Sequence, residues 1–167
     1  ERLEEIYREK TSFACTASFS SLLFYQRRSL RRGGFFMRAP LDAEADRTDL
    51  AWAVLADIAC STHEQLQHLV ELTGNEGGPI LGCGGGFQSE ALCQMLSDLS
   101  GRELRLRAGF RQATVQGLVT LCNDYLGEVP AKRDSALKTY HPRTGQLIHQ
   151  YAPAWREARD RANDIKA

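Results

Sequence analysis

The sequence predicts an α/β protein in which helices cover a sheet, on the basis of three observations. Apolar residues recur at helical spacing in three segments between residues 48 and 127, and short apolar or alternating runs lie between these segments. The resulting order of helix, strand, glycine turn, helix, strand and helix is typical of layered α/β folds. The length of 167 residues fits one domain, and 43% apolar and 25% charged residues are close to the averages of soluble globular domains.

Residues 1–46 form a lead-in segment whose fold the sequence does not define. Residues 1–10 are charged and helix-prone, and a strand is expected near residues 22–25. Residues 27–40 mix basic residues with glycine and phenylalanine, which indicates an irregular loop and hairpin. This stretch contains a cluster of four arginines: Arg27, Arg28, Arg31 and Arg32. We expect the cluster to be solvated or to pair with nearby acidic residues, because the formal net charge of the chain is zero and nucleic-acid binding requires a basic surface.

The first helix of the core is predicted to run from Thr48 to Leu72. Thr48 is suited to cap its N-terminus, since a hydroxyl oxygen can accept a backbone N–H there. The apolar residues at helical spacing are Leu50, Val54, Ile58, Leu66, Leu69 and Val70. The helix is expected to stop at Thr73-Gly74, because glycine suits the left-handed residue that follows a helix.

A buried strand and a second helix are predicted next. Residues 79–83 form a short apolar run bounded by turn residues, which is typical of a strand buried on both faces. Three glycines follow, and then a helix that ends at Ser100-Gly101. The buried face of this helix is predicted to carry Leu92, Met95, Leu96 and Leu99.

A second strand and a third helix complete the predicted core. Residues 103–107 alternate charged and apolar side chains, which predicts an edge or half-exposed strand. The third helix begins near Gln112 and closes at Gly127. Its inward face is predicted to carry Val115, Leu118, Val119, Cys122 and Leu126.

Residues 128–167 are expected to form a C-terminal loop and helix, with a strand at 136–140 and a polar helix around 146–163. No apolar run approaches the ~20 residues that cross a bilayer, and no charged leader precedes an apolar stretch. We therefore expect a cytoplasmic protein without a membrane or nucleic-acid partner. The chain begins with Glu1 rather than Met, and we expect it to start inside a longer gene product.

The five cysteines and four histidines predict neither a disulfide framework nor a metal site. The cysteines contain no CxxC pair and are odd in number, so most are expected to be small buried hydrophobic residues in a reducing compartment. Cys83 borders the glycine turn but has no partner base, and we expect it to be buried and structural. His63 and His68 are five apart and are expected on a polar face.

The most informative segment is Ile80-Leu-Gly-Cys-Gly-Gly-Gly-Phe-Gln-Ser-Glu90, in which a strand runs through three glycines into a helix. Residues without Cβ let the backbone approach a ligand closely, and the first N–H groups of a helix carry a positive partial charge. Together these features suit a phosphate or ribose group. The spacings GxGxxG and GxxxxGK[ST] are both absent. On chemistry alone, a ligand site and a ligand-free tight turn are equally supported.

Three linked stretches resemble the C-terminal region of the FGGY carbohydrate kinases. The stretch Gly84-Gly-Gly-Phe-Gln-Ser-Glu-Ala-Leu-Cys-Gln-Met-Leu-Ser-Asp-Leu-Ser-Gly-Arg102 is similar to the family's GGGxQNxLLxQxxADxxGR, with the rhamnulokinase branch closest in wording. Ala108-Gly-Phe-Arg-Gln-Ala-Thr-Val-Gln-Gly117 is similar to AGPxEATAxGN. Asp49-Leu-Ala-Trp-Ala-Val-Leu-Ala-Asp-Ile-Ala59 resembles DLxRAVLEGxA. The resemblance spans about residues 47–127 and implies that they form an FGGY-type C-terminal nucleotide-binding core.

The resemblance implies part of an actin-like or ribonuclease-H-like ATPase domain that binds ATP. Carried over by position, Gly84 and Gly85 would pack against the adenosine and α-phosphate, and Gly86 would keep the turn open. Gln88 and Ser89 would lie near the base or ribose. The substrate would be a ketose such as rhamnulose or fuculose.

The remaining machinery of such a kinase would belong to an N-terminal kinase domain. That domain carries the DxGT loop, the sugar pocket, the catalytic base and most of the Mg²⁺ site, so we identify no catalytic or metal-binding residue here and expect no kinase activity from these residues alone. Homo-oligomerisation stays open. Three departures, Ser89 for Asn, Gln112 for Glu and Ala56 for an acidic residue, keep a second reading open. In that reading the chain is a divergent, non-catalytic nucleotide-binding or structural module.

Overall fold

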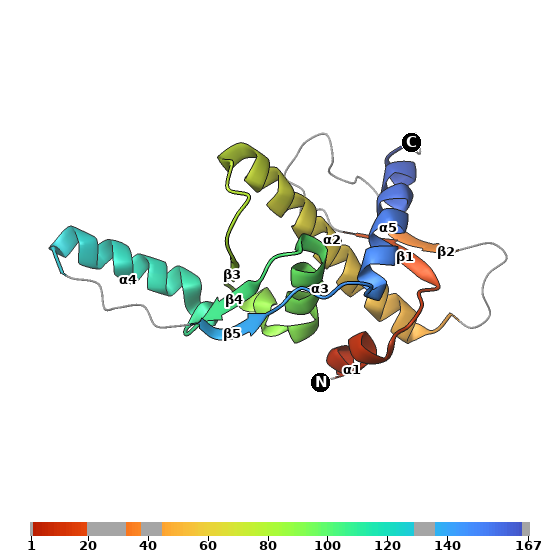
Figure 1. Ribbon diagram of the computed structural model, residues 1–167, viewed down its shortest axis with the longest axis horizontal. Coiled ribbons are helices and arrows are strands. Elements are labelled where there is room, and N and C mark those ends of the chain that lie inside the picture. Colours follow the sequence, from red (N-terminus) through yellow and green to blue (C-terminus); the bar gives the residue numbers. More distant parts are fainter. Residues whose placement is uncertain (1, 20–32, 38–44, 129–135, 165–167) are drawn as a thin grey trace.

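The computed structural model describes residues 2–19, 33–37, 45–128 and 136–164. Its elements, in chain order, are α1 (Arg2–Glu9), β1 (Cys15–Ser18), β2 (Gly34–Met37), α2 (Arg47–Thr73), β3 (Ile80–Gly82), the 3-10 helix η1 (Gly85–Gln88), α3 (Glu90–Ser100), β4 (Leu104–Arg107), the 3-10 helix η2 (Phe110–Gln112), α4 (Ala113–Leu126), β5 (Ala136–Tyr140) and α5 (Leu147–Asp164). Figure 1 shows a body built around α2, from which α4 projects as an arm. The strand predicted at residues 22–25 and the Arg27–Arg32 cluster lie outside the described residues.

The start of α2 corrects the predicted N-cap. Asp46, not Thr48, caps the helix: its carboxylate accepts the N–H groups of Thr48 at 2.7 Å and Asp49 at 3.0 Å. Asp49 completes the capping box by accepting the N–H of Asp46 at 3.1 Å. Thr48 lies inside the first turn of the helix, and its hydroxyl donates to Asp46 at 2.6 Å. The predicted end is confirmed, since Gly74 is left-handed with φ 64°.

Two small sheets lie on different sides of the helices. In the first sheet, β1 pairs antiparallel with β2. The second sheet has the order β3-β4-β5, in which β3 and β4 are parallel and β5 is antiparallel to β4. β4 is therefore the central strand rather than an edge strand. Its alternation was correctly read as one buried face, since Leu104 and Leu106 are buried, but sequence alternation does not show that β5 pairs on the other side.

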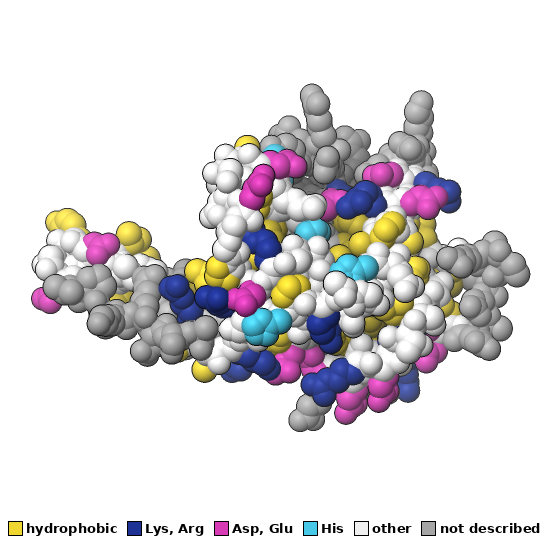
Figure 2. Space-filling model, viewed as in Figure 1, with side chains coloured by type: hydrophobic (Ala, Val, Ile, Leu, Met, Phe, Trp, Pro, Cys, Tyr) yellow, Lys and Arg dark blue, Asp and Glu magenta, His cyan; other side chains and the backbone are white. Residues whose placement is uncertain are grey.

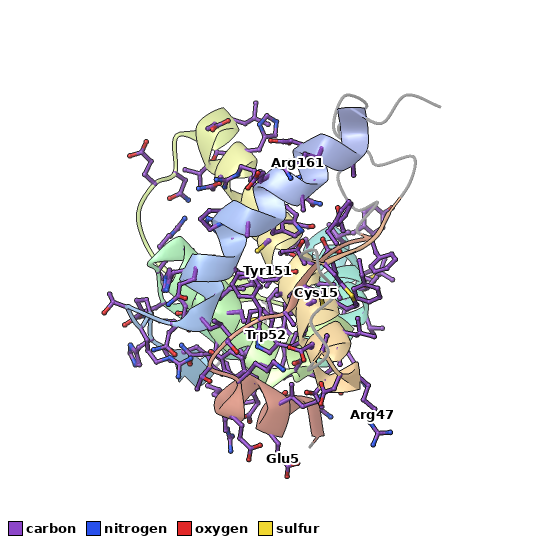
Figure 3. The ribbon with its side chains drawn as sticks, turned by 90° about the vertical axis from the view of Figure 1, so that its right-hand side faces the viewer. Glu5, Cys15, Arg47, Trp52, Tyr151 and Arg161 are labelled. Carbon is purple, nitrogen blue, oxygen red and sulfur yellow. The ribbon has the colours of Figure 1, made fainter. Side chains whose placement is uncertain are left out.

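The core lies between α2, α3, α5 and the two sheets. Its largest fully buried side chains include Trp52, Trp155, Tyr151, Met95, Leu104 and Ile148. Figure 3 shows Tyr151, Cys15 and Trp52 meeting in the interior. α5 matches the predicted terminal helix but is not polar throughout, because three residues at helical spacing, Ile148, Tyr151 and Trp155, are buried.

α5 is joined to the first half of the chain by buried hydrogen bonds. The hydroxyl of Tyr151 donates to the carbonyl of Ala53 in α2 at 3.1 Å and accepts the N–H of Ala17 in β1 at 2.9 Å. The indole N–H of Trp155 donates to the Asp57 carboxylate at 2.6 Å. These bonds fix the relative positions of α5, α2 and β1.

α4 has the predicted bounds but not the predicted burial. None of its residues is buried, and the side chains expected to face inward are exposed: Val115, Leu118, Val119, Cys122 and Leu126. Figure 2 shows hydrophobic side chains along this arm. The prediction is wrong because helical periodicity identifies an apolar face but does not identify what covers it. Among the described residues, no helix is long and apolar enough to span a membrane.

Candidate functional site

The glycine turn begins where β3 ends. Gly84 has φ 99° and ψ 171°, a conformation that favours glycine, and its N–H donates to the carbonyl of Phe110 at 2.7 Å. This bond ties the turn to η2, the short helix that follows β4. The carboxyl ends of the two parallel strands therefore support the turn, and this is the edge at which open α/β sheets bind ligands.

The front of the turn is open. A Cβ built on Gly84 would meet no atom within 4 Å, and one on Gly85 would meet only the amide nitrogen of Gln88, at 3.7 Å. One on Gly86 would meet only a methyl carbon of Leu92, at 4.0 Å. Among the residues that the structure describes, no side chain packs against the Cβ side of Gly84, and only Gln88 and Leu92 approach Gly85 and Gly86. Because Gly85 and Gly86 are the first residues of η1, their N–H groups have no acceptor within that helix.

Glycine is also required at position 82, in the strand before the turn, because of close packing. Gly82 is buried in β3, and a Cβ there would lie 2.7 Å from a methyl carbon of Leu106 and 2.8 Å from the ring of Phe87. Phe87 belongs to η1, so it fills the space beneath the turn. The close packing of the Phe87 ring on Gly82 holds the glycine turn in position at the end of the sheet.

The structure gives Ser89 a defined structural role. Ser89 caps α3, since its Oγ accepts the N–H of Leu92 at 3.3 Å. The same hydroxyl donates to the Glu4 carboxylate at 3.1 Å. The five sequence-predicted residues, Gly84, Gly85, Gly86, Gln88 and Ser89, thus lie on one continuous turn. Gln88 is exposed, whereas the half-buried Ser89 hydroxyl is occupied by protein groups.

A carboxylate next to the turn is neutralised within the protein. Glu90, in the first turn of α3, forms a hydrogen-bonded ion pair with Lys138 of β5. The Lys138 hydrogen bond lowers the pKa of Glu90, and Arg8 lies 3.9 Å away on the other side. The pairing reduces the negative charge that an anionic ligand at the turn would meet.

Three contacts of the site were not predicted from the sequence. They are the Phe110 carbonyl, which pairs with Gly84, Glu4, which pairs with Ser89 from 85 residues away, and Lys138, which pairs with Glu90 from 48 residues away. One local sequence feature relates to the Phe110 contact: Gly109, with a φ of 75°, turns the chain between β4 and η2. Pairing between distant segments is not visible in a local pattern.

Helix α2, which contains the stretch similar to DLxRAVLEGxA, holds a further carboxylate that was not predicted from the sequence. Ala56, where the family pattern has an acidic residue, is fully buried. The adjacent Asp57 is also buried, and it accepts hydrogen bonds from Trp155 and from the N–H of Phe19, the latter at 2.9 Å. The carboxylate on this helix thus serves packing between α2, α5 and β1.

The cysteine predictions are confirmed in part. All five thiols are free, and Cys60 and Cys93 are buried as predicted. Burial raises the pKa of the Cys93 thiol to about 11. Cys83 is exposed, which corrects the expectation of a buried residue: it follows the short strand β3 and lies at the start of the open turn.

Three of the histidines lie on helices, and His141 follows β5. His63 is half-buried, and burial lowers its pKa. The Nδ1 of His68 lies 3.4 Å from a carboxylate oxygen of Glu71. His149 lies with its Nε2 3.0 Å from the Asp98 carbonyl. In the part of the chain that the structure describes, no group of three or more His, Cys, Asp or Glu side chains is placed to hold a metal ion.

Comparison with known proteins agrees with this geometry. Residues 8–123 match the FGGY family of carbohydrate kinases, C-terminal domain. The chain is 32% identical over 148 residues to the putative sugar kinase YoaC of Bacillus subtilis, a match that covers 89% of this chain and 30% of that protein.

Solved structures show the same fold. Plasmodium falciparum glycerol kinase with ADP has a TM-score of 0.74 at 18% identity, covering 99% of this chain and 34% of that one. Xylulose kinase from Rhodospirillum rubrum has a TM-score of 0.69 at 13% identity, covering 96% and 32%. The predicted α/β class and actin-like ATPase fold are confirmed, and the chain spans about a third of the length of the relatives it matches. The chain belongs to the FGGY family of carbohydrate kinases and corresponds to its C-terminal domain.

Proposed function

We propose that this chain forms the nucleotide-binding part of an ATP-dependent carbohydrate kinase. The observation that carries the proposal is the open glycine turn, in which Gly84, Gly85 and Gly86 present side-chain-free backbone at the carboxyl edge of two parallel strands. Sugar kinases are phosphotransferases, and a kinase of this fold is known with ADP. The kinase would transfer the γ-phosphate to a hydroxyl of a ketose similar to rhamnulose or fuculose, in keeping with the wording of the motif at residues 84–102.

The residues of the turn divide the work between them. The N–H groups of Gly85 and Gly86 point from the start of a helix and are suited to hydrogen-bond a phosphate oxygen. The absence of Cβ atoms leaves room for the adenosine, and the exposed Gln88 amide can donate or accept at its edge. Ser89 holds the start of α3 in place rather than contacting the base directly.

Chemistry at the γ-phosphate requires groups beyond those in this chain. Phosphoryl transfer depends on Mg²⁺, on positioning of the phosphates and on a base for the attacking hydroxyl. We assign the base, the sugar pocket and most of the Mg²⁺ ligands to the N-terminal kinase domain. We place the protein in the cytoplasm, in keeping with five free thiols.

A second candidate function is a non-catalytic nucleotide-binding or structural module. It is favoured by one observation: Ser89, which stands where the family pattern has Asn, has no amide, and its hydroxyl is engaged by the Leu92 N–H and the Glu4 carboxylate. The two readings differ in whether the full-length protein turns over ATP in the presence of a sugar.

The proposed site is tested by Gly85→Val, measured by calorimetric titration of the full-length protein with ATP. The added side chain lies where the adenosine would approach, so we expect the affinity for ATP to fall at least about tenfold, which corresponds to about 1.4 kcal/mol. Gly77→Val is the matched control, because Gly77 lies in an exposed loop with no atom within 4 Å of its Cβ position. Equal affinity in wild type and Gly85→Val would exclude this site.

A further inference from the structure

A carboxylate at the start of α3 is held between two cations from distant parts of the chain. Glu90 is the first residue of α3, and one of its carboxylate oxygens pairs with Lys138 of β5. Its other oxygen lies 3.9 Å from the guanidinium of Arg8 in α1. Figure 1 shows α3 between β5 and α1, so the two cations approach Glu90 from different sides.

Lys138 is the better placed of the two cations. Its Nζ lies 5.1 Å from the centre of the ring of Tyr140, which is buried. Residues 138 and 140 are two apart on β5, so both side chains lie on the same face of the sheet. The hydrogen bond between Lys138 and Glu90 lowers the pKa of Glu90 and raises that of Lys138, so both groups are charged at neutral pH. The side chain of Arg8 is 70% exposed, and its pairing with Glu90 is correspondingly weaker.

Glu90 is close enough to the glycine turn to act on an anion bound there. Only three residues separate it from Gly86, and a stretch of four residues spans at most about 14 Å. At about 10 mM salt the screening length is about 30 Å, so an unpaired carboxylate at this position would repel a triphosphate at the turn. Glu90 also lies in the first turn of a helix, where a carboxylate interacts with the same positive end of the dipole as a bound anion.

We propose that Lys138 is a positioning residue for nucleotide binding that acts through Glu90, by pairing with the carboxylate and cancelling its charge beside the phosphates. The proposal deepens the proposed function and rests on it, because it takes the glycine turn as the phosphate site. Lys138 lies 48 residues beyond Glu90, so a strand outside the motif at residues 84–102 completes the electrostatics of the site.

The test is calorimetric titration of the full-length protein with ATP at two salt concentrations. Lys138→Met keeps an apolar side chain against Tyr140 and leaves Glu90 without its main partner. We expect the affinity for ATP to fall about threefold at about 10 mM salt, because the carboxylate then repels the phosphates. At about 1 M salt the screening length is about 3 Å, and the difference from wild type should disappear. A merely structural role of Lys138 would reduce the affinity at both salt concentrations.

Two further variants isolate the charge of Glu90. Glu90→Gln in the Lys138→Met background removes the uncompensated charge and keeps the side-chain shape, so it should restore the wild-type affinity at low salt. Arg161→Met is the matched control, because it also removes one positive charge from an exposed ion pair, with Glu157 on α5. Arg161 lies on a different element from the turn and from β5 (Figure 3), and this variant should bind ATP like wild type. Circular dichroism verifies that each variant is folded.

The outcomes separate this proposal from the proposed function. If wild type binds ATP and Gly85→Val does not, three results overturn the role of Lys138 alone: equal affinity of Lys138→Met and wild type at low salt, a loss that persists at high salt, or no recovery with Glu90→Gln. Failure of wild type to bind ATP, or equal binding by Gly85→Val, overturns the nucleotide site and the role of Lys138 with it.

Discussion

Tyr151 offers the sharpest test of how this fold is stabilised. Its hydroxyl is fully buried and joins three elements, because it accepts the N–H of Ala17 in β1 and donates to the carbonyl of Ala53 in α2. Burial raises the pKa of Tyr151, so the hydroxyl keeps its proton and remains a donor throughout the physiological pH range. Tyr151→Phe removes the hydroxyl oxygen and keeps the packed ring.

The magnitude follows from which partner is left unpaired. The Ala53 carbonyl lies inside α2 and keeps its intrahelical bond, so it loses little. The N–H of Ala17 is buried and loses the Tyr151 hydroxyl that accepts it, which costs about 1–3 kcal/mol. For a domain of this size, a loss of about 2 kcal/mol lowers Tm by about 4–8 °C.

Thermal unfolding followed by circular dichroism measures this difference directly. Tyr125→Phe is the matched control, since Tyr125 is 91% exposed on α4 and should unfold at the wild-type temperature. Equal unfolding temperatures for Tyr151→Phe and wild type would refute the reasoning, because they would show that the hydroxyl does not stabilise the link between β1, α2 and α5.

Three other predictions concern the capping box, the thiols and the packing beneath the glycine turn. The hydrogen bond from Thr48 lowers the pKa of Asp46 from 3.8 to about 2. The charged cap therefore stabilises the fold above about pH 4, and this stabilisation is lost as the pH falls toward 2. Asp46→Asn still caps the helix but does not titrate, so in unfolding experiments at different pH it should lose less stability over that interval than the wild type. A thiol reagent should modify Cys83 and Cys122 rapidly in the native protein and all five cysteines after unfolding, and rapid native modification of Cys60 or Cys93 would contradict the described burial. Gly82→Ala should destabilise the fold by about 1–3 kcal/mol in urea titrations, because its Cβ would meet Leu106 and Phe87, and an unchanged midpoint would show that Phe87 moves freely.

The helices and the glycine turn were largely predictable because their signals are local. Glycines at 74, 101 and 127 mark the ends of three helices, and each has a positive φ as that position requires. The short strands at residues 80–82 and 136–140 were also predicted, since turn residues bound them clearly. Local capping chemistry explains the one error at α2, where two residues separated by Arg47, Asp46 and Thr48, are both of a type that caps helices.

The arrangement of these elements was less accessible from the sequence. The antiparallel pairing of β1 with β2 joins segments of low local signal, and the central place of β4 depends on a strand some thirty residues later along the chain. The exposure of α4 could not be predicted, because an apolar helix face looks the same whether or not a partner is present. The glycine turn lies between a strand and a helix as predicted, and the role of its residues in nucleotide binding stays a prediction.

The placement of α5 has a consequence for how the protein folds during synthesis. Tyr151 bonds to a residue 134 positions earlier, and Trp155 to one 98 positions earlier. Bringing such distant residues together costs chain entropy before the new contacts can compensate for it, and this slows folding. While the ribosome is still making the chain, β1 and α2 lack the helix that joins them. The nascent polypeptide therefore exposes the apolar surface around Trp52 until α5 has been translated, and it is in that interval that a chaperone would have most effect.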